Sequence, residues 1–562
     1  MVTDPAKKPY DRIREHLASS RHKKLKMAVQ EAEKAGTSQP TLFDVSCRQR
    51  AKENEANGVV HDFVRALAYS GISMHQADGP LGDFVRKYCK AAKTMPTGQR
   101  LRIKYLKEAF DKDMAKIRDD MQAVKVSVIV DESPDITGVP AINTLLCYYS
   151  QKAKKKQVCL VDADIVNASN SYTVARVVGK ALFTVGKTWK DVAVATDSAE
   201  YMRKMVREIC EAEAIHILHV KDLAHLIHVS VDHAISSPCV PDVRSTVIKF
   251  GALFKHANKL HQKYIEICAY NSLFGADAKK PPSVVPNRWQ SFYKALVVVI
   301  EMWSSLTELV ECSHDSTKAE AIRAILSEKE VLYAKAVLMR DALEPLLDVQ
   351  KTLESGELLM PSFDHLVNVK LQQTVNELST MIGKSDREKG VLSMLPKSSA
   401  TLVKTCCEEF CAKISAKWDC TLKRNVSDKE ENQLTLWKLG AVLDPFQKRL
   451  LSQSFDDCRP LFNSVMDDVG SLREEFNQYL LEASPTNEGV EVMDFWNDAT
   501  VRYPRLANAA LSLLCLANGS WDVERTFSQL RYLQRPDRSR METEMLRMQM
   551  IMYVNKDVQN VE

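Results

Sequence analysis

Residues 125–133 read KVSVIVDES, a run of β-branched side chains that ends in two acidic residues and a serine. Two more runs of this kind follow, NTLLCYYS at 143–150 and VCLVDADIV at 158–166. β-Branched and aromatic residues favour strands, and short apolar runs of this length are typical of strands buried in a sheet. The sequence therefore predicts three consecutive strands that begin near residue 125.

Helices and strands alternate after this point. Helical spacing at 171–185 is followed by the strand-like run DVAVATDS at 191–198, by helical spacing at 199–213 and by the strand-like run IHILHV at 215–220. A further helix follows, so the predicted order is β-β-β-α-β-α-β-α. Three sequential strands followed by alternation predict an RNase H-like fold, in which helices pack on a mixed sheet.

Long helical segments flank these strands. From about 222 to 500 apolar residues recur at helical spacing, and no period of 20–50 residues indicates a solenoid. Before the strands, residues 59–93 predict a compact helical unit in which Gly71 breaks the first helix and Gly79-Pro80 opens the next.

The predicted fold class is α/β plus all-α, an RNase H-like mixed sheet interrupted by a large helical insertion, with a small helical N-terminal unit. The predicted parts are a basic N-terminal region at 1–35, a linker at 36–57, a small helical domain at 58–122, the first part of the core at 123–235, the insertion at 236–500 and the completion of the core at 501–562.

Positive charge is concentrated in two segments, although the net charge of the chain is only +4. Residues 1–30 hold eight Lys or Arg against three acids, and residues 86–118 hold eleven against three. Such segments suit DNA, because each neutralised phosphate releases counterions. The alternative for each is a solvated helix face.

Other bulk properties exclude several classes of protein. No run of about 18 apolar residues predicts a transmembrane helix, and the first residues lack the apolar region of a secretory signal. The 14 cysteines form no regular framework. We therefore expect a chain with reduced thiols, located in the cytosol or nucleus, and no membrane partner.

Acidic residues stand at the ends of two predicted strands. Asp131 closes the first and Asp197 closes the fourth. Active sites of α/β folds collect at the carboxyl ends of strands, and carboxylates there can share Mg²⁺. Two such ions can activate a water or 3′-hydroxyl for phosphoryl displacement. Glu524, in GSWDVERTFSQL, is the candidate third carboxylate.

Each of these acids has a plainer interpretation. An aspartate at a strand end often caps backbone N–H groups, and Glu524 alone would be a surface residue of a helix. Spacing alone therefore leaves both interpretations open.

The C-terminal sequence is the most specific part of the chain. Residues 518–555, NGSWDVERTFSQLRYLQRPDRSRMETEMLRMQMIMYVN, resemble the C-terminal dimerisation region of the hAT transposase superfamily. The shared elements are a small-residue turn, Glu524-Arg525, Phe527-Ser528, a basic segment with Arg538 and Arg540, and a final helix that ends near Asn555. Blocks at 128–133, 194–202, 219–229 and 286–293 resemble the family in the same order. The methionine-rich final helix suits either dimer packing or a core.

The resemblance implies a site that cuts DNA. In the family an Asp-Asp-Glu triad does so, which implies catalytic and metal-binding roles for Asp131, Asp197 and Glu524, with two Mg²⁺ or Mn²⁺ ions. The family's Arg-Trp motif matches Arg288-Trp289, which implies DNA binding. Trp289 would stack on a flipped base, or it is a core aromatic.

Two family motifs are incomplete. Asp222 stands where a Cys-x-x-His motif has its cysteine, and His225 is kept. The N-terminal part resembles the CGG triplet repeat-binding protein group, in which His16 and His22 would be the last two ligands of a zinc finger. No cysteine precedes Cys47, and a zinc site needs about four ligands. We therefore expect no zinc here, and interpret the finger as lost by gene decay or by a misplaced start codon.

Three hypotheses follow. The chain is a nuclear DNA transposase that cleaves and transfers strands as a homodimer or higher oligomer. Alternatively, it is a domesticated, non-catalytic DNA-binding protein, such as a transcriptional regulator, that dimerises through its C-terminus. The third hypothesis is a decayed copy with no selected function.

Overall fold

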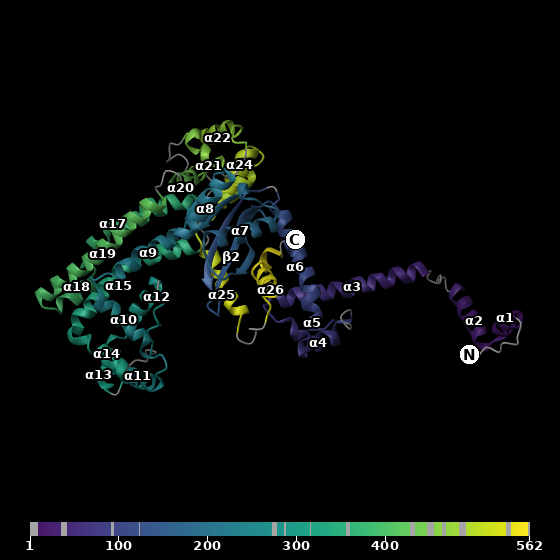
Figure 1. Cartoon of the computed structure of the whole chain (residues 1–562), viewed down its shortest axis with the longest axis horizontal. Helices are drawn as coiled ribbons and strands as arrows, with labels where there is room; N and C mark the ends of the chain where they lie inside the picture. Colours follow the sequence, from purple (N-terminus) through teal and green to yellow (C-terminus); the bar gives the residue numbers. More distant parts are fainter. Residues whose placement is uncertain are drawn as a thin grey trace. The chain divides into compact units, whose positions relative to one another are not determined.

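The computed structural model of the 562-residue chain describes residues 9–34, 42–90, 95–122, 124–271, 278–285, 288–314, 316–355, 360–426, 433–446, 454–463, 468–482, 491–535 and 541–559. The chain divides into two compact units, Met1–Phe110 and Asp111–Glu562. In its described residues the first unit is helical, whereas the second is built on a β-sheet (Figure 1).

The first unit is a series of helices, of which α3 is the longest. Its helices are α1 (Pro9–Ala18), α2 (Ser20–Lys34), α3 (Leu42–Tyr69), η1 (Met74–Asp78), α4 (Pro80–Tyr88), α5 (Gly98–Arg100), η3 (Leu101–Tyr105) and the start of α6 (Leu106–Asp120). Val64 and Leu67 bury one face of α3. The helix ends at Tyr69, two residues before Gly71, whose φ of +62° favours glycine. Both helix boundaries predicted at Gly71 and Gly79-Pro80 are confirmed.

Part of the predicted linker at 36–57 is helical. Residues 42–57 belong to α3, while 36–41 lie outside the described residues. The helical part is rich in Arg, Gln, Ala, Lys and Glu, which are good helix formers. Those propensities prevail over the mixed charge that suggested a linker.

The second unit has a five-stranded sheet in the order β3-β2-β1-β4-β5. Its strands are β1 (Val126–Pro134), β2 (Pro140–Ser150), β3 (Lys155–Ile165), β4 (Val192–Thr196) and β5 (His219–Lys221). The first three are antiparallel neighbours, and β4 and β5 continue parallel to β1. Helices α7 (Ser171–Thr184) and α8 (Glu200–Glu213) separate the later strands. The predicted order of strands and helices is confirmed.

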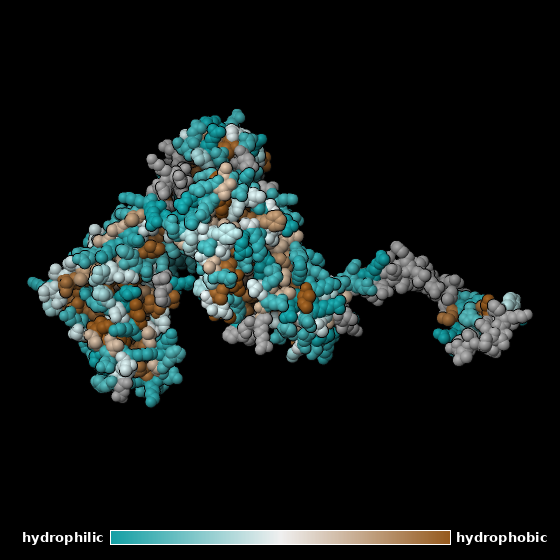
Figure 2. All heavy atoms as spheres, viewed as in Figure 1, coloured by the Kyte–Doolittle hydropathy of each residue, from teal (hydrophilic) through white to brown (hydrophobic). Residues whose placement is uncertain are grey.

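A large set of helices stands between the sheet strands and the C-terminal helices. They are α9 (Leu223–Ile235), α10 (Pro241–Leu253), α11 (Asn258–Asn271), α12 (Trp289–Glu301), α13 (Trp303–Cys312), α14 (Thr317–Arg323), α15 (Lys329–Glu354), α16 (Met360–Asp364), α17 (Gln372–Met381), α18 (Asp386–Ser393), α19 (Lys397–Val426), α20 (Gln433–Val442), α21 (Phe455–Asn463), α22 (Leu472–Leu481) and α23 (Val492–Ala499). Leu306, Leu309 and Phe250 are fully buried in one of its cores. The face seen in Figure 2 is mainly hydrophilic, with scattered apolar patches.

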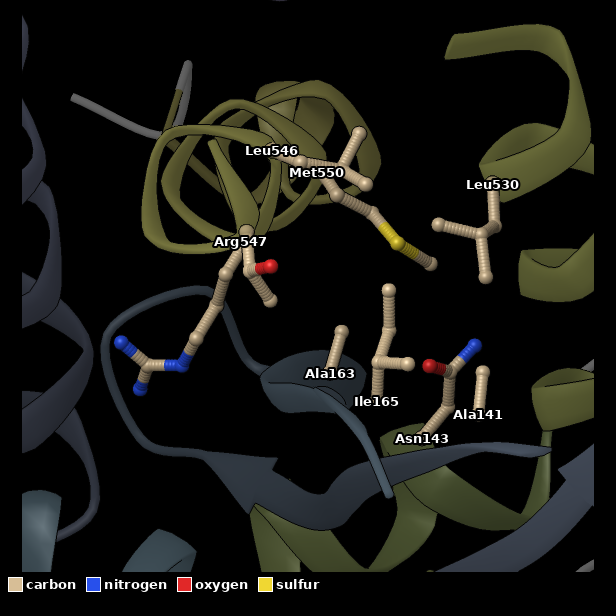
Figure 3. A pocket seen from close by; sticks show the side chains of 9 residues that line it. Ala141, Asn143, Ala163, Ile165, Leu530, Leu546, Arg547 and Met550 are labelled. Atoms are coloured by element: carbon tan, nitrogen blue, oxygen red, sulfur yellow. The ribbon is translucent and has the colours of Figure 1, made fainter. Parts of the chain in front are cut away.

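The last helices return to the sheet. They are α24 (Pro504–Leu514), α25 (Trp521–Leu533), α26 (Thr543–Val554) and α27 (Lys556–Gln559). Leu546 and Met550 of α26 and Leu530 of α25 converge on Ala163 and Ile165 of β3 (Figure 3). Three of the methionines in α26, Met548, Met550 and Met552, are at most 4% exposed. Their side chains therefore form part of the core of this unit.

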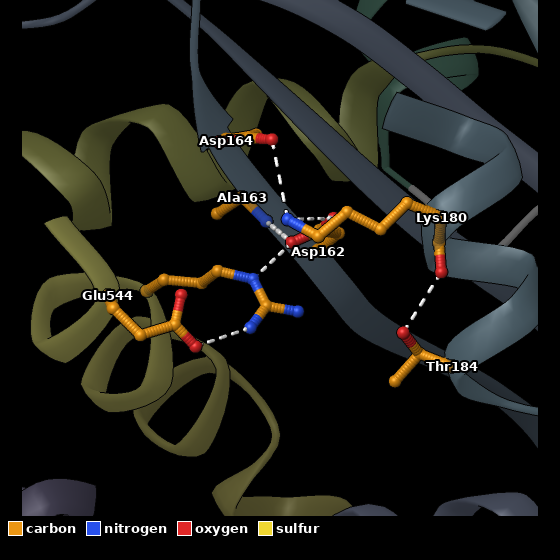
Figure 4. Close-up of polar contacts among 7 residues, drawn as sticks. Asp162, Ala163, Asp164, Lys180, Thr184 and Glu544 are labelled. Carbon is orange, nitrogen blue, oxygen red and sulfur yellow. Dashed lines mark hydrogen bonds and ion pairs between the residues drawn. The ribbon is translucent and has the colours of Figure 1, made fainter. Parts of the chain in front are cut away.

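Polar contacts fix α26 to the edge strand β3. The guanidinium of Arg547 donates to the fully buried carboxylate of Asp162, which Lys180 of α7 also approaches, at 3.6 Å (Figure 4). The Asn555 amide donates to the Leu160 carbonyl and accepts from the Leu160 N–H, both at 2.8 Å. Asn555 thus occupies backbone groups of an edge strand that would otherwise need a partner.

Candidate active site

Asp131 lies where strands β1 and β4 part. Ile129 is the last residue of β1 that pairs with β4, while Asp131 pairs with Asn143 of β2. The strand was expected to close at Asp131, but it continues to Pro134 because residues 132–134 keep their partners on β2. Asp131 is therefore at the carboxyl end of the parallel pairing, where a cleft can form between diverging strands.

Asp197 follows the last residue of β4. Its Oδ1 accepts a hydrogen bond from the Ala199 N–H at 3.0 Å, which turns the chain into α8. Its neighbour Thr196 is fully buried at the end of β4. Asp197 thus has the turn-forming role expected of an aspartate at a strand end, and its position also brings it to a cavity.

Glu524 is carried by the first turn of α25, and polar contacts fix this helix to the sheet. The Ser520 N–H and hydroxyl both donate to Asp222, at 2.7 and 2.6 Å. The Asn143 amide donates to the Thr526 hydroxyl at 2.7 Å. These contacts determine where Glu524 lies relative to Asp131, because Asn143 is the strand partner of Asp131.

The three candidate carboxylates line one cavity of about 880 Å³. We call it the carboxylate cavity. Its walls come from β1, the turn after β4, α9, α12, α15, α19 and α25, and include Asp131, Asp197, Asp222, His225, Arg288 and Glu524. Residues 131, 197 and 524 are distant in sequence, yet all three line this cavity.

Burial raises the pKa of all three carboxyl groups. The pKa of Asp131 lies well above its usual 3.8, first because of burial and then because of repulsion by Asp197 and Glu524. Burial also raises the pKa of Asp197, against the attraction of His225. The pKa of Glu524 is raised by burial and by repulsion from Asp222. Groups with raised pKa values that share a cavity are typical of functional sites.

The chemistry of these side chains fits a hard divalent cation. Mg²⁺ and Mn²⁺ prefer carboxylate oxygens, and a cation would offset the repulsion among the three groups. Within the described part of the chain, however, no three Asp, Glu, His or Cys side chains are grouped closely enough to hold a metal ion. The type of donor therefore fits, whereas their present spacing is wider than that of a formed metal site.

Arg288 and Trp289 differ in their exposure. Arg288 lines the carboxylate cavity and counteracts the rise in the pKa of Glu524. Trp289 begins α12 with 1% of its surface exposed, and its indole N–H donates to the Gln350 side chain at 2.7 Å. Trp289 is a core aromatic in this structure, so stacking on a base would require it to leave that position.

A hydrogen-bonded group that the sequence did not indicate joins the Arg-Trp motif to α25. The Gln350 and Gln290 amides donate to the Glu354 carboxylate, at 2.7 and 3.0 Å. The Arg525 guanidinium donates to the Glu354 carbonyl at 2.8 Å. Of these contacts, only that between Gln350 and Glu354 could have been found in the sequence, because residues four apart on a helix lie side by side.

Asp222 and His225 belong to the start of α9. Asp222 caps this helix, because its Oδ1 accepts from the His225 N–H at 3.1 Å. An aspartate just before the apolar run LAHLI is a typical helix N-cap signal. The His225 side chain lines the carboxylate cavity.

The remaining motif residues lie elsewhere. In the first unit His16 Nε2 and His22 Nδ1 are 3.2 Å apart, and among the described residues no third His, Cys, Asp or Glu side chain completes a metal-binding group with them. Arg538 and Arg540 lie outside the described residues.

Comparison with known proteins identifies the C-terminal helices. Residues 475–558 match the hAT family C-terminal dimerisation region. This part of the chain is related to hAT transposases. The matched region contains α25 and α26, which carry Glu524 and cover β3, and a dimerisation region implies self-association. No curated protein matches the chain. None of the described helices is both long and apolar enough to cross a membrane.

Proposed function

We propose that this chain is a hAT transposase-derived protein that binds DNA, dimerises, and cleaves and transfers DNA strands in a metal-dependent reaction at Asp131, Asp197 and Glu524. One observation carries the proposal. These three acids come from β1, the end of β4 and α25, yet they line the same cavity. The match to the hAT dimerisation region supports it independently.

The roles of the residues follow from their chemistry. Asp131, Asp197 and Glu524 would hold Mg²⁺ or Mn²⁺, which lowers the pKa of bound water and neutralises charge on a phosphoryl group. Arg288 lines the same cavity and offers a guanidinium to a DNA phosphate. His225 provides a further hydrogen-bonding group on this wall. The basic N-terminal segments would bind DNA without strong sequence preference. A DNA substrate would place the protein in the nucleus.

A second candidate is a domesticated, non-catalytic DNA-binding regulator that dimerises through its C-terminus. The wide spacing of the carboxylates and the buried position of Trp289 favour it. It predicts DNA binding that weakens steeply with salt and no strand cleavage.

Incubation of the full chain with supercoiled plasmid and Mn²⁺ separates the two candidates. Glu524→Gln keeps the size of the side chain and removes its charge, while Glu320→Gln on the exposed side of α14 is a matched control. The transposase-derived nuclease predicts nicking by the native chain and by the control, with a loss of about 100-fold or more in Glu524→Gln. Salt-dependent binding without nicking by any form would overturn the catalytic proposal and favour the regulator.

A further inference from the structure

A second cavity, of about 490 Å³, lies among the helices α13, α15 and α18. These helices belong to the helical lobe drawn to the left of the sheet in Figure 1. None of the lining residues of the carboxylate cavity contributes to it. We call it the aromatic–acidic cavity, and it is lined by Trp303, Ser304, Thr307, Glu308, Glu311, Lys329, Glu330, Tyr333, Val391, Met394 and Leu395.

Two aromatic rings form one wall. The ring centroids of Trp303 and Tyr333 are 5.4 Å apart, with the planes tilted by 43°. The Trp303 ring also contacts the fully buried Phe250 ring edge-on, at 6.4 Å between centroids. Both rings are only partly buried. Their position is therefore fixed by the core of the helical lobe, while part of their surface faces the cavity.

The charged lining is acidic. Three glutamates, Glu308, Glu311 and Glu330, line the cavity with one lysine, Lys329. Lys329 pairs with Glu311 at 3.0 Å. Glu308 accepts a hydrogen bond at 2.8 Å from the Asn271 amide, which is neutral and leaves the negative charge in place. The cavity therefore carries an excess of negative charge and would repel the DNA backbone.

Apolar side chains complete the opening. Val391 lies in the last turn of α18, Met394 and Leu395 come directly after this helix, and Met394 is 81% exposed. An aliphatic stem could lie along these side chains while its charged end reached the aromatic rings and carboxylates. Aromatic faces attract cations, most strongly tryptophan, and carboxylates add to that attraction.

We propose that the aromatic–acidic cavity binds a lysine or arginine side chain of a partner protein. The excess of carboxylates selects a cation, the tilted pair of rings gives it a face to pack on, and the apolar rim accommodates its stem and a neighbouring residue. This site is independent of the DNA-cleaving function proposed above.

Fluorine NMR of the full chain containing 5-fluorotryptophan tests the proposal. The Trp303 signal is identified by its loss in Trp303→Phe. The probes are the Nα-acetyl methylamides of lysine, arginine and norleucine, added as chloride-matched solutions so that ionic strength is constant. The expected result is a saturable shift of the Trp303 signal with lysine and arginine, but not with norleucine, which has an aliphatic side chain without the charge.

Charge variants provide the second arm. Glu308→Gln combined with Glu330→Gln should weaken binding of the lysine probe about two- to fivefold, whereas Glu320→Gln outside the cavity should leave it unchanged. Unaltered binding in the double variant would overturn the assignment to the carboxylates. A shift with norleucine as large as that with lysine would overturn the proposal that the cavity binds a cation. Absence of any shift of the Trp303 signal with all three probes would overturn it as well. Thermal unfolding of each variant verifies that the fold is kept.

Discussion

The Asp222 carboxylate accepts two hydrogen bonds from Ser520, one from the Ser520 N–H at 2.7 Å and one from the Ser520 hydroxyl at 2.6 Å. The other oxygen of the same carboxylate caps α9 through the His225 N–H. One buried side chain thus joins the start of α9 to the start of α25. Glu524 lies four residues further along α25, so its place in the carboxylate cavity depends on this joint.

Loss of the Asp222 carboxylate should therefore destabilise the second unit. Asp222→Ala removes a helix cap and leaves buried donors of Ser520 without their acceptor, which together cost about 2–4 kcal/mol. Urea unfolding measures the change in the free energy of unfolding. In a double-mutant cycle with Ser520→Ala, we expect a coupling of about 1–3 kcal/mol. A coupling near zero would show that the two residues do not act together.

Neutralising Asp131 should stabilise the protein at neutral pH. The folded state raises the pKa of Asp131 above 3.8, so this group favours folding below that value and loses this contribution as the pH rises through its folded pKa. Asp131→Asn removes a charge that burial and two neighbouring acids disfavour. We expect a higher Tm for the variant than for the native chain at about pH 8, with the gain shrinking towards about pH 4.

Divalent cations should act against this difference in Tm between Asp131→Asn and the native chain. Mn²⁺ or Mg²⁺ should raise the Tm of the native chain and have a smaller effect on Asp131→Asn, because a bound ion stabilises the folded state by mass action. Ca²⁺, which demands more oxygen ligands, provides a comparison. Equal shifts in both proteins would argue against metal binding at Asp131.

Gln350 should couple the Arg-Trp motif to α15. Gln350→Leu leaves the Trp289 N–H without its acceptor and removes a donor from Glu354, so the free energy of unfolding should fall by about 1–3 kcal/mol. Trp289→Phe removes the same hydrogen bond from the other side and keeps an aromatic ring. If the two changes are additive, the Trp289–Gln350 hydrogen bond contributes nothing to stability, contrary to this prediction.

Removing the Arg547 side of its contact with Asp162 should destabilise the protein more than neutralising both sides. Arg547→Met leaves a fully buried carboxylate without its guanidinium partner and should cost about 3–5 kcal/mol. Adding Asp162→Asn to the same chain should recover part of that loss, because a neutral amide is easier to bury. Thermal or urea unfolding tests both variants, and a double variant less stable than Arg547→Met would contradict the explanation.

Local patterns in the sequence predicted the strands and two of the three candidate carboxylates. Strand formation by a β-branched run is a local preference of neighbouring residues, and an acid that follows such a run lies at the strand end. Asp131 and Asp197 could therefore be placed at one edge of the sheet from the sequence. Glu524 needed the family resemblance, because 327 residues separate it from Asp197 and no spacing rule reaches that far.

Contacts between distant segments could not be predicted. Asp222 and Ser520 are 298 residues apart, and Trp289 and Gln350 are 61 apart. An Asp, Ser, Trp or Gln side chain could form a hydrogen bond with many polar groups in a chain of this length. The packing of the helices decides which of these partners it meets. The helix at 42–57 was missed for a different reason, since a polar, charged sequence can form either a linker or an exposed helix.

The return of the last helices to the first strands also sets the order of events on the ribosome. Asp162 and Arg547, which join β3 to α26, are separated by 385 residues. At about 5–20 residues per second, roughly 20–80 s of synthesis elapse between them. During that interval the nascent sheet exposes the surface that α25 and α26 later cover. The carboxylate cavity therefore acquires Glu524 only after helices α9 to α24 have been synthesised, 327 residues later than Asp197.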